Sequence, residues 1–302
     1  MPNLIRSGKV KEVYEVSNDE LEFVFSDRIS VFDKIIPSNI PYKGETLART
    51  SAYWFDLLKQ LGIRTHFIRT TAPNKMRVKR VNVISDYSKI NTQTKNYLIP
   101  LELITRSFVY GSLWDRVKQG IVKPEQLGFE KGHVVKAAEP LPEPFFEVTT
   151  KLEKTDRNLT TEEAMKISGI TPEEFKAMKE LCLKIDQQIN TTVKQRGLIH
   201  VDGKKEFAFD AERNLMVVDT FGTADEDRFW DAKEFEQGKY LERSKEFIRQ
   251  YYRSTGYHEK LYSARKEGKE EPPIPPLPDE MVKQASAIYI KLFEDMTGQP
   301  FR

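Results

Sequence analysis

The sequence predicts an α+β fold with two lobes, a β-rich first part followed by a mixed part. Residues up to about 100 read mainly as strands, because β-branched and aromatic side chains alternate or run together there. Later residues carry helices with clear start signals. We therefore predict a β-rich lobe over residues 1–103 and a larger α+β lobe over residues 104–302, with a ligand cleft between them.

The composition is that of a globular chain. Its 302 residues are 39% hydrophobic and 31% charged, enough for one large or two ordinary domains. No apolar run approaches the roughly 20 residues that a membrane span needs, and the first residues form no apolar signal region. A net charge of +2 does not by itself indicate nucleic-acid binding. We expect a cytoplasmic protein that binds neither membrane nor nucleic acid, as a monomer or a homo-oligomer.

The first hundred residues contain three clear strand patterns and one helix. The strand patterns cover residues 10–16, 21–25 and 77–84. The helix runs from about Gly44 to Leu61, where leucines and a tryptophan recur at helical spacing.

The middle of the chain changes from loop to helix. Residues 121–150 include four prolines and little periodicity, which favours an extended loop. Residues 160–163 have the spacing of a capping box, and residues 171–174 add proline at the first helical position. The second helix continues to Gly197, and Cys182 on its apolar stripe is interpreted as buried packing.

The last part is mostly helical, broken by a proline-rich segment over residues 271–278 that we expect to be extended. Asp279 is then expected to cap a final helix that ends near Gly298.

Two acidic residues in one predicted hairpin suggest a metal site. If residues 211–214 form its turn, Glu206 lies opposite Asp219 on the same face. Two carboxylates placed so repel each other, so a cation is expected between them. Mg²⁺ that holds nucleotide phosphates is the usual candidate. The alternative is a solvated hairpin whose register differs by one residue.

A pair of lysines near the start suggests a phosphate clamp. Lys9 and Lys11 follow Gly8 at alternate positions on a predicted strand, so their side chains project to the same face. A solvent-exposed face would show the same alternation. The run is not a P-loop, because the required glycine and serine or threonine spacing is missing.

Two further polar clusters follow apolar strands. Residues 26–33 have the character of a functional loop, although a turn in which Asp27 and Ser30 satisfy local backbone groups explains them equally. Arg106 precedes Ser112 by six residues, and the two can hold a phosphate through a bidentate contact and a hydroxyl.

Taken together and in order, these motifs resemble those of the SAICAR synthetase family, from about Gly8 to Gly298. The motifs are Gly-Lys-Val-Lys-Glu-Val-Tyr, Ser-Asp-Arg-Ile-Ser-Val-Phe-Asp, Ile-Pro-Leu-Glu-Leu-Ile-x-Arg, Gly-Ser-Leu-Trp, Pro-Glu-Pro-Phe-Phe, Thr-Thr-Lys and Asp-Arg-Phe-Trp. The resemblance implies that family's two-lobed α+β fold, with ATP in the cleft.

The resemblance implies an ATP-dependent ligase of purine biosynthesis that requires Mg²⁺. Such an enzyme joins L-aspartate to 5-amino-1-(5-phosphoribosyl)imidazole-4-carboxylate and forms SAICAR, ADP and phosphate. A carboxylate is a poor electrophile, so the expected path is phosphorylation to an acyl phosphate, attack by the amine and loss of phosphate. The protein then mainly positions anionic substrates and neutralises charge.

The resemblance also implies roles for single residues. The matching residues, grouped by implied role, are Gly8, Lys9 and Lys11 for the nucleotide, Glu102 for the imidazole, Arg106, Ser112 and Arg228 for the ribonucleotide phosphate, Glu206 and Asp219 for Mg²⁺, and Asp33, Lys151 and Asp156 near the reacting groups.

Several positions depart from the family pattern. Thr220 stands in place of a second carboxylate, Glu226 and Asp227 in place of two serines, Ala208 in place of a glycine, and residues 154–156 read Lys-Thr-Asp in place of Glu-His-Asp. These changes leave two alternatives open. One is a paralogous carboxylate–amine ligase with another amine donor, and the other is a catalytically silent ATP-binding relative.

Overall fold

A computed structural model describes residues 3–302 of the chain, which divide into two compact units. The described part of the first unit comprises residues 3–57, 67–80 and 223–302, and the second comprises residues 58–66 and 81–222. The two units interleave along the chain and are described separately. The division into lobes after residue 103 stays a prediction.

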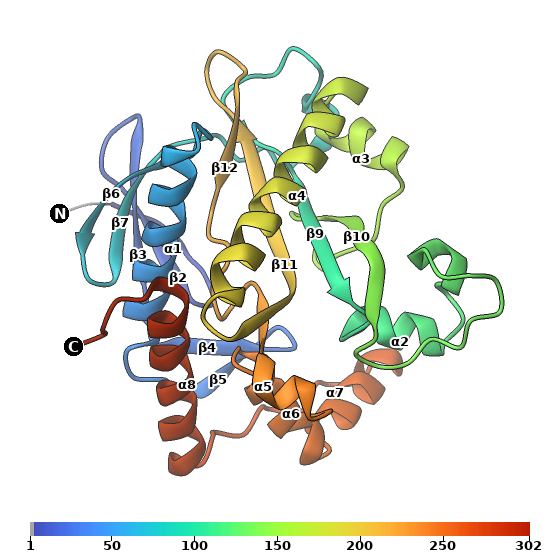
Figure 1. Ribbon diagram of the computed structural model, residues 1–302. Coiled ribbons are helices and arrows are strands. Elements are labelled where there is room, and N and C mark those ends of the chain that lie inside the picture. The colour runs from blue at the N-terminus through green and yellow to red at the C-terminus, as the bar shows by residue number, and fades with distance from the viewer. Residues whose placement is uncertain (1–2) are drawn as a thin grey trace. The chain divides into compact units, whose positions relative to one another are not determined.

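The first unit holds two small sheets and most of the C-terminal helices (Figure 1). Its elements are β1 (Asn3–Ser7), β2 (Lys11–Glu15), β3 (Glu20–Phe25), β4 (Arg28–Val31), β5 (Lys34–Asn39), α1 (Lys43–Gln60, whose last turn belongs to the second unit), β6 (Phe67–Ala72), β7 (Lys75–Lys79), β13 (Arg228–Asp231), α5 (Ala232–Glu236), α6 (Glu246–Ser254), α7 (Tyr257–Lys266) and α8 (Asp279–Thr297).

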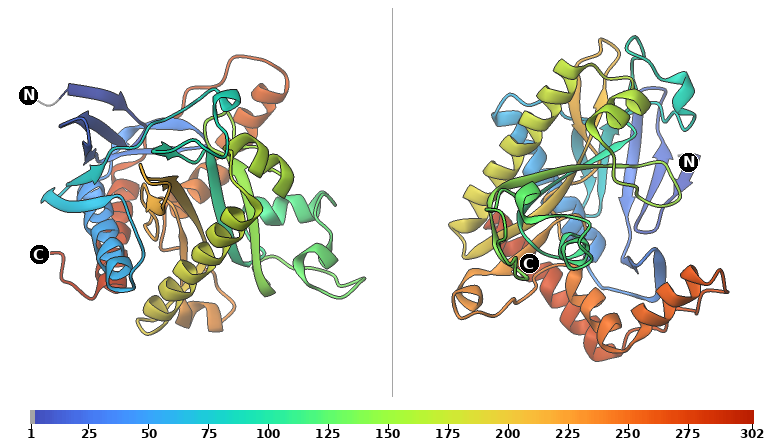
Figure 2. Two further views of the ribbon diagram at one scale, coloured as in Figure 1. Left: turned by 90° about the horizontal axis from the view of Figure 1, so that it is seen from above. Right: turned by 90° about the vertical axis from the view of Figure 1, so that its right-hand side faces the viewer.

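Within the described residues, the larger sheet of this unit has the strand order β1-β2-β3-β7-β6 and is antiparallel throughout. Helix α1 lies against it (Figure 2), and Phe55 of α1 stacks on Phe67 of β6 with ring centroids 5.3 Å apart. Gly44 permits the close approach of the helix, because a Cβ atom there would lie 2.5 Å from the Phe25 carbonyl oxygen.

The predicted strands at residues 10–16 and 21–25 are confirmed as β2 and β3, whereas the pattern at residues 77–84 continues only to Lys79. The expectation that Lys9 and Lys11 alternate on one strand is wrong. The Gly8 N–H donates to the Lys11 carbonyl oxygen at 2.8 Å and closes a turn between β1 and β2. Lys9 therefore lies in a turn and Lys11 begins the next strand.

Strands β4 and β5 are joined by a two-residue turn in which Phe32 and Asp33 both have positive φ angles, of 50° and 65°. Two positive φ angles are typical of a type I′ hairpin turn, which favours asparagine and glycine. A bulky residue there is strained. Helix α7 supports the turn: the Phe32 ring lies 4.8 Å from that of His258, and Arg265 donates to the Phe32 carbonyl oxygen.

A buried cluster of charges joins distant parts of the first unit. The Lys43 ammonium lies 2.8 Å from the Asp225 carboxylate, which also lies 3.8 Å from the Lys245 ammonium and accepts a 2.5 Å hydrogen bond from the Tyr289 hydroxyl. Burial lowers the pKa of Lys245 to about 8, although the Asp225 charge opposes that shift. The lysines lower the pKa of Asp225 against the effect of its burial.

The second unit is built on one antiparallel sheet. Its elements are η1 (Tyr87–Lys89), β8 (Tyr97–Leu98), β9 (Leu101–Phe108), α2 (Ser112–Lys118), η2 (Pro124–Leu127), β10 (Pro140–Thr150), α3 (Thr161–Ser168), α4 (Pro172–Lys194), β11 (Leu198–Phe209) and β12 (Leu215–Val218), where η marks a 3₁₀ helix.

The strand order of this sheet is β10-β9-β11-β12, with the short β8 also paired to β11. Helix α4 crosses β9 and β11 (Figure 1), and its apolar stripe is buried against them. Both capping boxes are confirmed, because the Thr160 and Thr171 hydroxyls accept from Glu163 and Glu174 backbone N–H groups. Cys182 is fully buried, as predicted.

The expected loop over residues 121–150 is wrong for its last eleven residues, which form β10. Three of the prolines lie at alternate positions, 140, 142 and 144, and the pairing with β9 shifts register between Pro140 and Phe145. Proline is tolerated in a strand whose N–H groups need no partner, as at an edge or a bulge.

The predicted hairpin register is also wrong. Phe209 pairs with Leu215, so five residues rather than four connect the strands, and Glu206 pairs with Val218 rather than Asp219. Arg213, with a φ angle of 65°, adopts a left-handed conformation that accommodates the extra residue in the turn. Likewise Asp279 is the first residue of α8, after Pro278 at the cap position, although the helix does end at Gly298.

The segment over residues 271–278 has no helix or strand, as expected for its prolines. Among residues 3–302, none of the helices combines the length and apolar character needed to cross a membrane.

We expect the Lys245→Met variant to gain stability at neutral pH, by about 2 kcal/mol, because burial disfavours the charged lysine. Above pH 8 the folded state loses this proton before the unfolded state does, so wild-type stability rises and the difference between the proteins shrinks towards pH 10.5. Urea unfolding at pH 7.5 and pH 9.5 measures both effects. A pH-independent difference would contradict the assignment, and exposed Lys283→Met is the matched control.

Candidate functional site

The second unit gathers acids and lysines on one face of its sheet. On β11, Lys204 and Glu206 point to the same side because side chains alternate along a strand. Lys204 pairs with Ile104 of β9, so Glu102, two residues away on β9, shares that side. Lys151 follows β10 directly, where its N–H donates to the Pro100 carbonyl oxygen.

These four residues form what we call the acid–lysine cluster. The Lys204 ammonium lies 2.8 Å from the Glu102 carboxylate and 3.4 Å from that of Glu206. The Lys151 ammonium lies 3.9 Å from Glu102 and is in direct contact with Glu206. Each lysine therefore bridges both glutamates, which offsets the repulsion between two buried carboxylates.

Burial and charge shift the ionisation of this cluster. Burial raises the pKa of Glu102 to about 7, and the charges of Glu206 and Asp156 add to that effect while the lysines oppose it. Burial opposes the charge of Lys151, but the carboxylates of Glu206 and Asp219 outweigh it and raise the pKa of Lys151. The structure thus brings together three residues predicted for the site, Glu102, Lys151 and Glu206, and the charges of Asp156 and Asp219 act on them.

Glu206 and Asp219 offer the donors that a Mg²⁺ ion prefers. Asp219 follows the last residue of β12 with a φ angle of 59°, so its side chain does not follow the strand alternation. The Oε2 atom of Glu206 is buried and accepts no hydrogen bond from the described residues, although it contacts the Lys151 ammonium. Hard carboxylate oxygens in this setting fit Mg²⁺, which would compete with Lys151 for Glu206.

A second group of charges surrounds Arg106, and we call it the Arg106 cluster. The Arg106 guanidinium lies 2.7 Å from the Glu147 carboxylate and 2.9 Å from that of Asp202, and it donates to the Ser112 hydroxyl at 3.2 Å. Arg116 of α2 also contacts Glu147. The predicted pair of Arg106 and Ser112 is therefore in contact, and it is accompanied by two carboxylates that the sequence did not indicate.

The remaining predicted site residues belong to the first unit. The Lys9 ammonium lies 2.5 Å from the Asp33 carboxylate, and both side chains are about half exposed or more. The Lys11 ammonium lies 4.5 Å from the centre of the Phe23 ring. Arg228 pairs with the buried carboxylate of Glu246 at 3.2 Å.

Gly8 is positioned by its own turn. Its carbonyl oxygen accepts from Arg28, and a Cβ atom at Gly8 would lie 3.0 Å from the Lys11 carbonyl oxygen. A side chain there would crowd the turn that carries Lys9.

Sequence reasoning missed Lys204, Arg116, Glu147 and Asp202 as members of these clusters. The signal for Lys204 was available, because it alternates with Glu206 on the predicted hairpin. No such signal exists for Glu147, because the prolines of residues 121–150 favour a loop, in which side chains do not alternate.

A buried ion pair supports β11 from α4. Lys205 is fully buried and contacts the Asp186 carboxylate, which also lies 3.7 Å from the His200 ring. Asp186 belongs to α4, and both of its partners belong to β11. The pair therefore ties the helix to the strand that carries Lys204 and Glu206.

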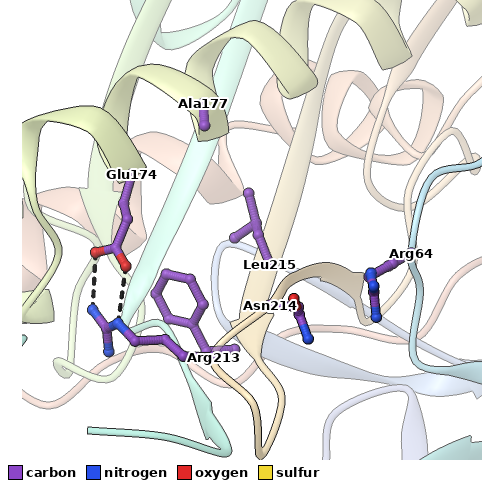
Figure 3. Close-up of a pocket in the computed structure, with 7 residues that line it drawn as sticks. Arg64, Glu174, Ala177, Arg213, Asn214 and Leu215 are labelled. Atoms are coloured by element: carbon purple, nitrogen blue, oxygen red, sulfur yellow. Dashed lines mark hydrogen bonds and ion pairs between the residues drawn. The ribbon is translucent and has the colours of Figure 1, made fainter. Parts of the chain in front are cut away.

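A cavity of about 340 Å³ lies at the turn end of the β11–β12 hairpin (Figure 3). Arg213 and Glu174 form a two-pronged ion pair on one side of it, and Arg64 lies on the other side. Arg213 also donates to the carbonyl oxygens of Thr94 and Gly169. Its donors are thus used to hold the hairpin turn, and none of the residues predicted for the site lines this cavity.

An antiparallel α+β fold with lysines and arginines interleaved among buried acids is suited to an enzyme that acts on anionic substrates. The family model described as SAICAR synthetase matches residues 4–264. The phosphoribosylaminoimidazole-succinocarboxamide synthase of Thermoplasma volcanium is 54% identical over 296 residues, which cover 98% of this chain and 99% of that protein. The chain therefore belongs to the SAICAR synthetase family, and like its relatives it is a ligase.

Solved structures agree with this assignment. The SAICAR synthase of Saccharomyces cerevisiae, complexed with SAICAR, has a TM-score of 0.75 at 27% identity, over 99% of this chain and 96% of that one. A type-2 SAICAR synthetase in complex with ADP is 24% identical with a TM-score of 0.69, over 98% and 99% of the two chains, and shares the fold. The predicted family and α+β fold class are both confirmed.

We expect Asp186→Leu to lower the free energy of unfolding by roughly 3 kcal/mol, because it removes a buried carboxylate from Lys205. The double variant Asp186→Leu/Lys205→Met should recover most of that loss, since it removes both charges. Urea unfolding measures the three proteins. Glu180→Leu, at an exposed ion pair of the same helix, is the control, and a double variant no more stable than Asp186→Leu would refute the pairing.

Proposed function

We propose that this ligase joins L-aspartate to 5-amino-1-(5-phosphoribosyl)imidazole-4-carboxylate and converts ATP to ADP and phosphate. The single observation that carries the proposal is the acid–lysine cluster, in which Lys151 and Lys204 each lie near both Glu102 and Glu206. The names of the relatives support the same reaction, since one solved relative is complexed with SAICAR and another with ADP.

The reaction needs positioning and charge neutralisation more than covalent catalysis. The substrate carboxylate attacks the terminal phosphorus of ATP, which releases ADP and forms an acyl phosphate. The aspartate amine then attacks the acyl carbon, a proton leaves the nitrogen, and phosphate departs. Lys151 and Lys204 are the cations that would stabilise the negative charge of these steps.

In this proposal, the second unit binds the ribonucleotide. Glu102 would accept a hydrogen bond from the amino group on the imidazole ring, and Arg106 with Ser112 would hold the phosphate. Asp156, whose charge acts on Glu102, would lie near the reacting groups. Arg228 remains a predicted ligand of the same phosphate.

The first unit would bind the nucleotide through the turn that carries Gly8, Lys9 and Lys11. Asp33, in contact with Lys9, would fix the ammonium beside the phosphates. Mg²⁺ held by Glu206 and Asp219 would neutralise phosphate charge and orient the transferred group.

We expect ADP release from Mg-ATP to require both the imidazole carboxylate ribonucleotide and L-aspartate, with one SAICAR formed for each ADP. A coupled ADP assay and chromatography of the product measure the two. If another amino acid replaces L-aspartate with a higher kcat/KM, the chain is a ligase with a different amine donor. If ATP binds and no acid and amine pair gives ADP, the chain is a silent relative.

We expect Glu206→Gln to lower kcat by about 100-fold or more, because it removes a metal ligand and the carboxylate that positions Lys151. The control Glu212→Gln changes the same charge in the exposed hairpin turn and should leave kcat unchanged. Both are assayed at saturating Mg²⁺, with circular dichroism as a check of folding. An undiminished rate for Glu206→Gln would refute the metal assignment.

A further inference from the structure

The Arg106 cluster contains more negative charge than a phosphate site needs. Arg106 and Glu147 expose only 5% and 8% of their side chains, and Asp202 exposes 5%. The Arg106 Nε atom donates to Glu147 at 2.8 Å, one Nη atom donates to Asp202 at 2.9 Å, and the other donates to Ser112 at 3.2 Å. Every nitrogen of this guanidinium therefore has an acceptor within the protein.

The two carboxylate oxygens of Glu147 contact two different arginines. One of its oxygens lies 2.7 Å from Arg106, and the other contacts Arg116, whose side chain is 20% exposed. Two guanidinium groups that converge on one anion, with a hydroxyl beside them, are an arrangement that also suits a phosphate group. The Glu147 carboxylate thus occupies a place that a phosphate could take.

The two carboxylates on Arg106 are held in different ways. Asp202 pairs directly with Arg106 across β9 and β11, so the backbone register fixes that contact. Glu147 pairs with Ile104, and it reaches Arg106 diagonally through its longer side chain. Among the described residues, its strand β10 is the last one in the sheet order, next to β9, and its register shifts between Pro140 and Phe145. Rotation of the longer Glu147 side chain can therefore take its carboxylate off Arg106 while β10 stays in place.

We propose that Glu147 is a specificity-determining residue that competes with the substrate phosphate for Arg106. A phosphorylated ligand binds when the Glu147 carboxylate leaves Arg106 and stays with Arg116. A dianionic phosphate has enough charge to displace the carboxylate, whereas a singly charged anion or an unphosphorylated ribonucleoside does not. This inference rests on the proposed function, which places the ribonucleotide phosphate on Arg106.

The test is the binding of ribose 5-phosphate to the whole protein, measured by isothermal titration calorimetry without turnover. Glu147→Gln keeps the side-chain shape and one acceptor oxygen but removes the competing charge, so we expect the dissociation constant to fall about tenfold. Glu147→Asp keeps the charge on a shorter side chain and should tighten binding less. Glu143→Gln, exposed on the same strand, makes the same change in net charge and should leave binding unchanged.

A second measurement separates this role from a purely structural one. With the ribonucleotide substrate, Glu147→Gln should lower KM about tenfold and change kcat less than twofold. A structural counter-ion would give the opposite sign, with looser binding when its charge is lost. Binding of ribose 5-phosphate that is unchanged or weaker in both Glu147 variants overturns the inference. Tighter binding by a protein that forms no SAICAR would overturn the proposed reaction and leave the competition at Arg106 supported.

Discussion

The register of β9 against β11 is the constraint on which the chemistry of the second unit depends. It sets Asp202 opposite Arg106 and Lys204 opposite Ile104, so these three charged side chains share one face, whereas Lys205 lies on the other. A slip of β11 by one residue would turn Asp202 and Lys204 to the other face, where α4 packs. The ion pair between Asp186 and Lys205 resists such a slip, because it fixes β11 to that helix.

Nearby lysines explain why the fold tolerates several buried carboxylates on this face of the sheet. The repulsion between Glu102 and Glu206 is offset by two ammonium groups that each lie near both carboxylates. Even so, Glu102 retains a pKa of about 7, which shows that burial is compensated only in part. The carboxylates of such a site can bind a cation, and its ammonium groups can stabilise developing negative charge. Both need little rearrangement, because the charges are already in place.

The sequence predicted best where local chemistry decides the structure. The capping boxes at Thr160 and Thr171 depend on neighbours a few residues away, and both were confirmed. The burial of Cys182 was also confirmed, because helical periodicity marks which face of a helix is apolar. The sequence predicted less well where a local conformation depends on a contact with a residue far away in the chain. The five-residue connection to Leu215 depends on Arg213 adopting a left-handed conformation, and that residue is held by Glu174 of α4.

The Arg106 cluster also contains partners that sequence patterns did not reveal, because they are distant in the sequence. Arg106 and Ser112 could be paired from their spacing, but Glu147 lies on a proline-containing strand that local patterns assign to a loop. Only its pairing with β9 brings that carboxylate to the guanidinium. The residues proposed to bind ligand were thus predictable one by one, whereas the carboxylates that modulate them depend on the tertiary structure.

Two acids proposed for the reaction, Asp33 and Asp219, have left-handed backbone conformations. Aspartate tolerates this region better than most residues, and the conformation turns its side chain away from the alternation of the adjoining strand. Phe32 shares the strained turn with Asp33 and has no such tolerance, so its conformation must be held by contacts elsewhere. The rings of His258 and Tyr262 pack around Phe32, and Arg265 binds its carbonyl oxygen. Helix α7 therefore acts on Asp33 through Phe32: the packing of Phe32 fixes the direction of the residue that follows it, and the Asp33 carboxylate contacts Lys9.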